Sequence, residues 1–217
     1  MNTSVKATLI TIAVALVLVI AGVIYAVGQQ PPAPEVTDDG RLQTTRADSH
    51  VLDEGGADAV TVVEFLDFEC EACGAFYPIV EELRAEHAGD ITYVVRYFPL
   101  PGHVNSMQAA LAAEAAAGQG RFEDMYHLLF ARQTQWSHAA AETPDVFRGY
   151  AEELGLDLGA YDAAIADPAT RERIESDKRD GEALGVTSTP SFFVDGAYVQ
   201  LERWDDVERA IAEAVNG

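Results

Sequence analysis

The sequence predicts an α/β fold in which a helical segment interrupts a small β-sheet, preceded by one N-terminal transmembrane helix. Three observations in the folded part lead to this prediction. The first is a strand–helix–strand pattern over residues 60–98, and the second is a long helical stretch over residues 99–184. The third is an Asp-Gly turn between apolar residues after residue 190, followed by a last amphipathic helix.

The transmembrane helix is predicted over residues 7–28, which are uncharged and mostly Ala, Val, Leu and Ile. At about 1.5 Å per residue, a helix of this length reaches roughly 33 Å and crosses a hydrocarbon core of about 30 Å. A cleaved signal peptide is the alternative, because Ala26-Val27-Gly28 is a weak small-x-small cleavage site. Lys6 precedes the segment and acidic residues follow it. The positive-inside rule therefore predicts a single-pass cell-membrane protein, with residues 1–28 as cytosolic N-terminus and anchor and the rest extracytoplasmic.

Residues 29–57 are predicted to be an extracytoplasmic linker, because they are polar, proline-rich and without apolar periodicity. Within them, a short strand near residues 50–52 is an option. The folded domain is predicted over residues 58–217.

The first unit of this domain is a strand, a helix and a second strand. A near-continuous apolar run over residues 60–66 indicates a strand buried on both faces. Residues 71–88 carry one apolar helical stripe that ends at Gly89, and residues 91–98 form the second strand. A helix that joins two strands predicts a parallel pair.

The rest of the domain is helical up to about residue 184 and then returns to strands. Thr143-Pro144 predicts a helix start with a capping hydroxyl, and Asp167-Pro168 opens a last charged helix of this block. Asp195-Gly196 predicts a hairpin. A closing helix is expected to carry one apolar face, formed by Trp204, Val207, Ile211 and Val215.

Charge and cysteine content limit the function. The chain has 14 Lys and Arg against 36 Asp and Glu, a formal net charge of −22. This charge argues against nucleic acid and against binding to an anionic lipid surface, both of which require basic patches. Cys70 and Cys73 are the two cysteines of the sequence, so no disulfide framework exists.

Cys70-Glu71-Ala72-Cys73 directly follows the first strand of the domain and opens its first helix. Free backbone N–H groups and the positive end of the helix dipole stabilise a thiolate there, and the thiolate is the nucleophile of disulfide exchange. A zinc site is the first alternative, but none of the histidines form a pair with ligand spacing. A structural disulfide is the second, but one across four residues restricts little chain entropy. We therefore predict redox chemistry, with Cys70 as the attacking sulfur and Cys73 as the resolving one.

Residues 62–78, V-V-E-F-L-D-F-E-C-E-A-C-G-A-F-Y-P, resemble the active-site segment of the thioredoxin superfamily, specifically its DsbA-like branch. Glu64 stands where that superfamily keeps a buried carboxyl, and Pro78 where it kinks the active-site helix. Thr189-Pro190 matches its cis-proline loop. The resemblance implies a thioredoxin core over residues 58–98 and 185–217, with a DsbA-type helical insertion over residues 99–184.

The resemblance also implies roles for the site residues. Glu64 is expected to be buried and to take the proton of Cys73, and Pro190 to be cis beside the sulfurs. The backbone of Thr189 is expected to pair with a substrate strand. Glu69 and Glu71 flank Cys70 and disfavour a thiolate, so we expect a less acidic thiol and a weaker oxidant than the strongest members of the branch.

The predicted function is an extracytoplasmic protein disulfide oxidase that acts on the cysteines of exported proteins. It needs no cofactor, because the dithiol itself carries two electrons, and no metal. A quinone-linked integral membrane protein is the expected redox partner. A disulfide isomerase or reductase of the same fold is the alternative, and a non-enzymatic metal- or partner-binding protein is a third. Asp67, His103, Trp136 and His138 are interpreted as surface, packing or capping residues.

Overall fold

The computed structural model describes residues 19–20, 36 and 42–217. The transmembrane helix predicted over residues 7–28 and the first part of the linker therefore lie almost wholly outside the described residues. Within the described residues, none of the helices combines the length and apolar character that a membrane crossing requires.

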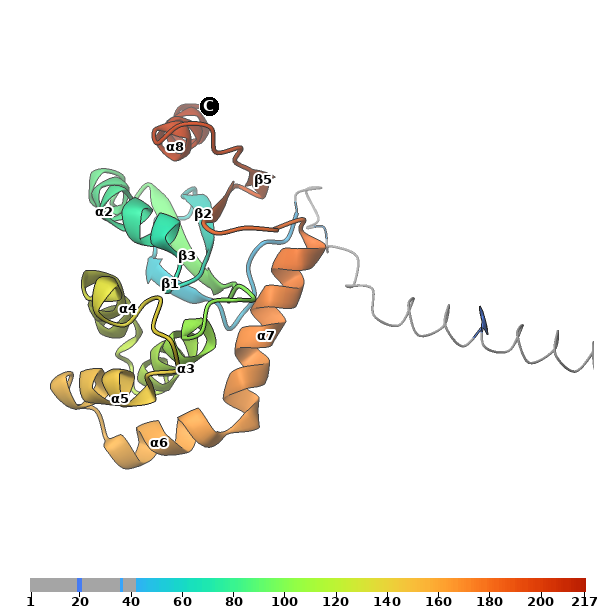
Figure 1. The fold of residues 1–217 in the computed structure, drawn as a ribbon. Coiled ribbons are helices and arrows are strands. Elements are labelled where there is room, and N and C mark those ends of the chain that lie inside the picture. Colours follow the sequence, from blue (N-terminus) through green and yellow to red (C-terminus); the bar gives the residue numbers. More distant parts are fainter. Residues whose placement is uncertain (1–18, 21–35, 37–41) are drawn as a thin grey trace, which may run out of the picture. The chain divides into compact units, whose positions relative to one another are not determined.

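A five-stranded sheet with the order β1-β3-β2-β4-β5 forms the centre of the domain (Figure 1). Its strands are β1 (His50–Asp53), β2 (Val60–Leu66), β3 (Ile91–Tyr97), β4 (Ser191–Val194) and β5 (Ala197–Tyr198). The β2–β3 pair is parallel, as the strand–helix–strand pattern predicts, and the other neighbours are antiparallel. The hairpin predicted around Asp195-Gly196 joins β4 to β5, and both turn residues have positive φ.

Helices follow the predicted order. The helix between β2 and β3 is α2 (Glu71–Glu86), and the chain closes with α8 (Asp206–Asn216). The insertion between β3 and β4 contains α3 (Ser106–Ala117), α4 (Phe122–Ala131), the 3-10 turn η1 (Gln133–Gln135), α5 (Pro144–Glu153), α6 (Leu158–Ala166) and α7 (Pro168–Ala183). In Figure 1, α3 to α6 gather at one end of the domain, and α7 runs back to the sheet.

The two faces of β2 belong to different cores. Val60, Val62 and Leu66 join the large core that also contains residues of α2, the insertion and α8. Val63 and Phe65 face the opposite way, into a smaller core with Phe98 and Phe193. Alternate residues of a strand point to opposite faces, so Glu64 lies on the same face as Val62 and Leu66, the face covered by α2. This alternation explains why the strand is apolar throughout.

Helix α7 approaches the smaller core closely because Gly181 has no side chain. A Cβ atom at this position would lie 2.8 Å from Cδ2 of Phe98 and 3.0 Å from Cδ1 of Phe65. Both are ring atoms of buried residues. The glycine therefore sets how near the insertion comes to the sheet.

The linker expected over residues 29–57 is too long. Strand β1 pairs with β3, and the Arg96 guanidinium donates a 2.8 Å hydrogen bond to the backbone oxygen of buried Thr44. Residues 44–53 are held to the domain by backbone hydrogen bonds and by ion pairs of Arg46 and Asp48. Such contacts do not require apolar side chains, so the sequence shows no apolar periodicity there.

Two local expectations also differ. The Thr143 hydroxyl donates to Oδ1 of Asn105 instead of capping α5. Trp204 precedes α8 and is 58% exposed, and its ring packs against Phe76 of α2, 4.8 Å between centroids. The apolar face of α8 is thus formed mainly by Val207 and Ile211.

Candidate active site

The two cysteines lie at the start of α2, shortly after the end of β2. Cys70 is the N-cap residue, and its backbone N–H donates to the carbonyl oxygen of Asp67 at 3.1 Å. Both thiols are free; Cys70 is 7% exposed and Cys73 1%. The sulfur that reaches solvent is therefore that of Cys70.

The surroundings separate the acidities of the two thiols. Hydrogen bonding with Cys73 lowers the pKa of Cys70 to about 6, against the opposing effect of burial. The side chain of Thr189 and the backbone N–H groups of Cys73 and Ala72 also lower this pKa. Burial raises the pKa of Cys73 well above 9, and the negative charges of Cys70 and Glu64 add to this rise. One thiol is thus mostly ionised at neutral pH while the other keeps its proton, as attack and resolution require.

Glu64 is a buried carboxyl on the face of the sheet that α2 covers. Its Oε2 accepts a 2.6 Å hydrogen bond from the hydroxyl of Tyr93 on β3. Burial raises the pKa of Glu64 to about 7, although the hydrogen bond from Tyr93 opposes this. A carboxyl that titrates near neutral pH can exchange a proton with the thiol of Cys73 in either direction.

Glu64→Gln is expected to slow the release of a mixed disulfide by Cys73 on the order of a hundredfold, without changing the initial attack by Cys70. In the wild type this release should accelerate as pH rises through about 7, where Glu64 ionises. Stopped-flow single-turnover rates between pH 5 and 9 would measure both steps. An unchanged pH profile in the variant would contradict the role of Glu64.

The same variant has a matching stability signature. The unfolded chain loses the proton of Glu64 near pH 4.5 and the folded chain near pH 7. Glu64 therefore makes the wild type progressively less stable between these two values, by about 3 kcal/mol in all. Urea denaturation should show Glu64→Gln gaining stability over the wild type across this window and keeping the difference above it.

Thr189 and Pro190 lie beside the sulfurs, although they are 119 residues away from Cys70 in the sequence. The Thr189–Pro190 peptide bond is cis, as the family resemblance implies. The Cys70 thiol donates a 3.4 Å hydrogen bond to the carbonyl oxygen of Thr189, and β4 begins at the next residue after Pro190. The structure thus brings all five predicted site residues to one end of the β2–β4 region, while their catalytic roles stay predictions.

The insertion holds the active-site turn through Gln133, a residue that the sequence did not single out. Its buried side-chain amide donates 2.8 Å hydrogen bonds to the carbonyl oxygens of both Phe68 and Cys70. Gly74 makes room for this amide, because a Cβ there would lie 2.2 Å from Oε1 of Gln133. The amide and its partners are 63 to 65 residues apart in sequence, so no local pattern indicates the contact.

The carboxylates that flank Cys70 are both engaged by the insertion. Glu69 is 1% exposed and accepts hydrogen bonds from the backbone N–H groups of Asn105 at 2.6 Å and His138 at 3.0 Å. Glu71 is paired with the His138 ring at 2.9 Å. Despite these two carboxylates, the pKa of Cys70 is lowered from the ordinary thiol value to about 6. That its thiol is less acidic than in the strongest oxidants stays a prediction.

A family model described as thioredoxin matches residues 50–213. The chain belongs to this thioredoxin family. The match includes both cysteines and the whole insertion, and it begins at β1 rather than at β2.

Solved structures with the same fold include DsbA-type proteins and related oxidoreductases, in agreement with the fold that the resemblance implies. A thioredoxin-like oxidoreductase from Silicibacter pomeroyi DSS-3 is 27% identical, with a TM-score of 0.66 over 80% of this chain and 96% of that one. BdbD from Bacillus subtilis is 21% identical, with a TM-score of 0.68 over 87% of this chain and 100% of that one. Wolbachia pipientis alpha-DsbA1 is 19% identical, with a TM-score of 0.66 over 79% and 93%.

Curated relatives of this thioredoxin-family chain are much longer proteins. A Na(+)/H(+) antiporter NhaA 1 from Mycobacterium sp. (strain KMS) is 38% identical over 148 residues, which are 65% of this chain and 23% of the relative. A Na(+)/H(+) antiporter NhaA from Herminiimonas arsenicoxydans is 42% identical over 137 residues, 63% of this chain and 21% of the relative. The chain therefore spans about a fifth to a quarter of the length of the curated relatives it matches.

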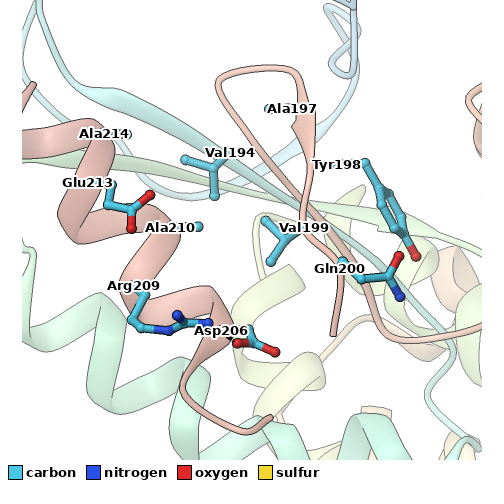
Figure 2. Close-up of a pocket in the computed structure, with 10 residues that line it drawn as sticks. All are labelled: Val194, Ala197, Tyr198, Val199, Gln200, Asp206, Arg209, Ala210, Glu213 and Ala214. Carbon is cyan, nitrogen blue, oxygen red and sulfur yellow. Dashed lines mark hydrogen bonds and ion pairs between the residues drawn. The ribbon is translucent and has the colours of Figure 1, made fainter. Parts of the chain in front are cut away.

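Two cavities of similar size lie in the thioredoxin-family domain. One of about 540 Å³ borders the site, between the first turn of α2 and the end of α4 with η1, and includes Glu71, Gly74 and His138. Figure 2 shows the other, of about 530 Å³, between α8 and the segment around β5. At one end of it Arg209 pairs with Asp206, and neither cysteine lines it. In the part of the chain that the structure describes, no cluster of side chains fits a metal ion.

Proposed function

We propose that this chain is a protein thiol–disulfide oxidase that forms disulfide bonds in client proteins. The observation that carries the proposal is the difference between the two thiols. Cys70 is the more exposed one and its pKa is lowered to about 6, whereas Cys73 is buried and its pKa is raised. A disulfide whose exposed sulfur leaves as a stable thiolate is readily given away, because a low leaving-group pKa speeds exchange and favours the reduced enzyme.

The reaction transfers two electrons from client to enzyme. A client thiolate attacks Sγ of Cys70 in the Cys70–Cys73 disulfide, and the sulfur of Cys73 leaves. Glu64 supplies the proton that this sulfur takes up. A second client thiolate then attacks the client sulfur of the mixed disulfide, so the client disulfide forms and Cys70 leaves as a thiolate.

The client is held by backbone pairing next to Thr189 in this proposal. Thr189 and Pro190 precede β4 and lie against Cys70, so an extended client segment can pair with the Thr189 backbone. The cavity at Glu71 and Gly74, in the first turn of α2, offers room for client side chains.

Equilibrating the domain with a series of glutathione ratios would test the direction of electron flow. We expect a reduction potential well above the roughly −270 mV of thioredoxin, and rapid oxidation of a reduced two-cysteine peptide. For this two-electron couple, about 30 mV corresponds to roughly 1.4 kcal/mol. A potential at or below that of thioredoxin, with the pair reduced in living cells, would indicate a reductase. Efficient reshuffling of a wrongly paired client without net oxidation would indicate an isomerase.

The proposed setting is the outer side of a cell membrane, with residues 1–28 as anchor and exported proteins as clients. The uncharged run over residues 7–28 and the charge pattern around it support this setting. A quinone-linked integral membrane protein is the proposed acceptor of the electrons, since the two cysteines leave no internal route for reoxidation. Extraction at alkaline pH and protease accessibility in intact spheroplasts would test the location. Antiport, the activity in the names of the curated relatives, is not proposed, because the match covers so little of them.

A further inference from the structure

Asp67 and His103 form a buried-to-surface pair next to the active-site turn. The His103 Nδ1 lies 2.7 Å from Oδ2 of Asp67, whose side chain is fully buried, while the His103 side chain is 22% exposed. Asp67 lies three residues before Cys70, and its backbone oxygen accepts the hydrogen bond from the Cys70 N–H. A backbone hydrogen bond thus joins Asp67 of this pair to Cys70, the residue that carries the nucleophilic sulfur.

Asp67 is itself fixed, so it can orient an imidazole. Its Oδ1 accepts from the backbone N–H of Glu69 at 2.8 Å, and its Oδ2 accepts from the backbone N–H of Leu100 at 2.9 Å. A carboxylate that receives three donors has its charge spread over those bonds and its position set by two loops. Because Nδ1 of His103 faces Asp67, the opposite ring nitrogen is directed away from it, and within the described residues that nitrogen has no hydrogen-bond partner.

We propose that His103, oriented by Asp67, is a positioning residue that stabilises the Cys70 thiolate through the charge of its imidazolium. This inference rests on the proposed redox function of Cys70, but not on the direction of electron flow. His103 reaches the site from the loop between β3 and α3, 33 residues after Cys70 in the sequence.

The charged groups around His103 decide its protonation. Burial lowers its pKa, but the hydrogen bond and charge of Asp67, followed by the charges of Cys70 and Glu69, raise it above the ordinary value. The His138 ring lies edge-on to it, 6.5 Å between centroids, and is itself paired with Glu71. Coupling between two sites is reciprocal: if the thiolate raises the proton affinity of His103, protonated His103 stabilises the thiolate equally.

The test compares two substitutions that separate charge from hydrogen bonding. His103→Gln keeps a donor for Asp67 but has no charge, whereas His103→Lys keeps the charge. Thiolate absorbance at 240 nm and alkylation rates between pH 4 and 9 would report the acidity of Cys70. We expect about two- to fivefold slower alkylation at pH 6 in His103→Gln, little change in His103→Lys, and none in the control His127→Gln. His127 is bonded to Tyr77 on the flank of α2.

A titration curve of His103→Gln that matches the wild type would overturn the inference, and so would equal losses in His103→Gln and His103→Lys. If the variants do not fold, NMR titration of the wild type decides. The pKa of His103 should fall when the thiolate is replaced by the neutral Cys70–Cys73 disulfide, and an unchanged value would overturn the inference. If the reduction potential is that of a reductase but the pKa of Cys70 still depends on His103, the oxidase proposal is overturned and the inference about His103 stands.

Discussion

Replacing Cys73 by serine is expected to accumulate mixed disulfides with model clients, whereas replacing Cys70 by serine should give none. In Cys73→Ser the exposed thiol of Cys70 remains, and the serine hydroxyl can replace the hydrogen bond with which Cys73 lowers the pKa of Cys70. In Cys70→Ser the remaining thiol is 1% exposed, and its pKa is far above neutral. We expect trapping rates with a disulfide-containing peptide to differ at least about a hundredfold.

Non-reducing electrophoresis and intact mass would measure this difference, because each mixed disulfide adds the mass of one peptide half. The wild type should show the adduct only transiently, since Cys73 resolves it. Equal trapping by the two single variants would mean that the roles of the sulfurs are not divided as proposed.

Asp177→Ala is expected to destabilise the domain by about 3–5 kcal/mol. Asp177 is fully buried in α7, and its carboxylate accepts from the Arg96 guanidinium at 2.7 Å and from the backbone N–H of Tyr97 at 3.2 Å. Arg96 is 1% exposed and also bonds to Asp180 at 2.6 Å. Without Asp177, a buried cation loses its most buried partner and a backbone donor loses its acceptor.

Urea denaturation would measure the loss, with Asp162→Ala as the matched control. Asp162 is also bonded by an arginine, Arg148, at 2.9 Å, but both side chains are about half exposed. Such exposed pairs contribute between about 0 and 1 kcal/mol. A similar effect of the two substitutions would show that burial of the Arg96–Asp177 pair does not determine its contribution.

Patterns within a few residues predicted most of the fold. The apolar run of β2, the stripe of α2 and the Asp-Gly turn before β5 each indicate their element locally, and the structure has all three. For strand β1 the sequence offers only an option, and for the segment before it the sequence predicts a linker. Its contacts are a backbone ladder and the hydrogen bond from Arg96 to Thr44, neither of which depends on an apolar pattern.

The site could be predicted only where its residues form a motif. Cys70, Cys73, Glu64 and the Thr189-Pro190 pair follow from spacing and from a family resemblance. Polar site residues in loops could not be predicted, because their hydrogen-bond partners are distant in sequence. The sequence gives no reason to connect Asp67 with His103, yet the two side chains are hydrogen-bonded to each other. Gln133, bonded to two carbonyls of the active-site turn, gave no local signal at all.

The contact between Cys70 and Thr189 has a consequence for the order of events during synthesis. The ribosome must add 119 residues after Cys70 before Thr189 exists. At about 5–20 residues per second, this takes on the order of 6–24 s. Throughout that interval the cysteines lack the Thr189 contact and the neighbouring β4, so Cys70 lacks one of the contacts that lower its pKa. The complete site, with Thr189 and cis-Pro190 beside Cys70, is therefore expected to form only after the last strands have been synthesised.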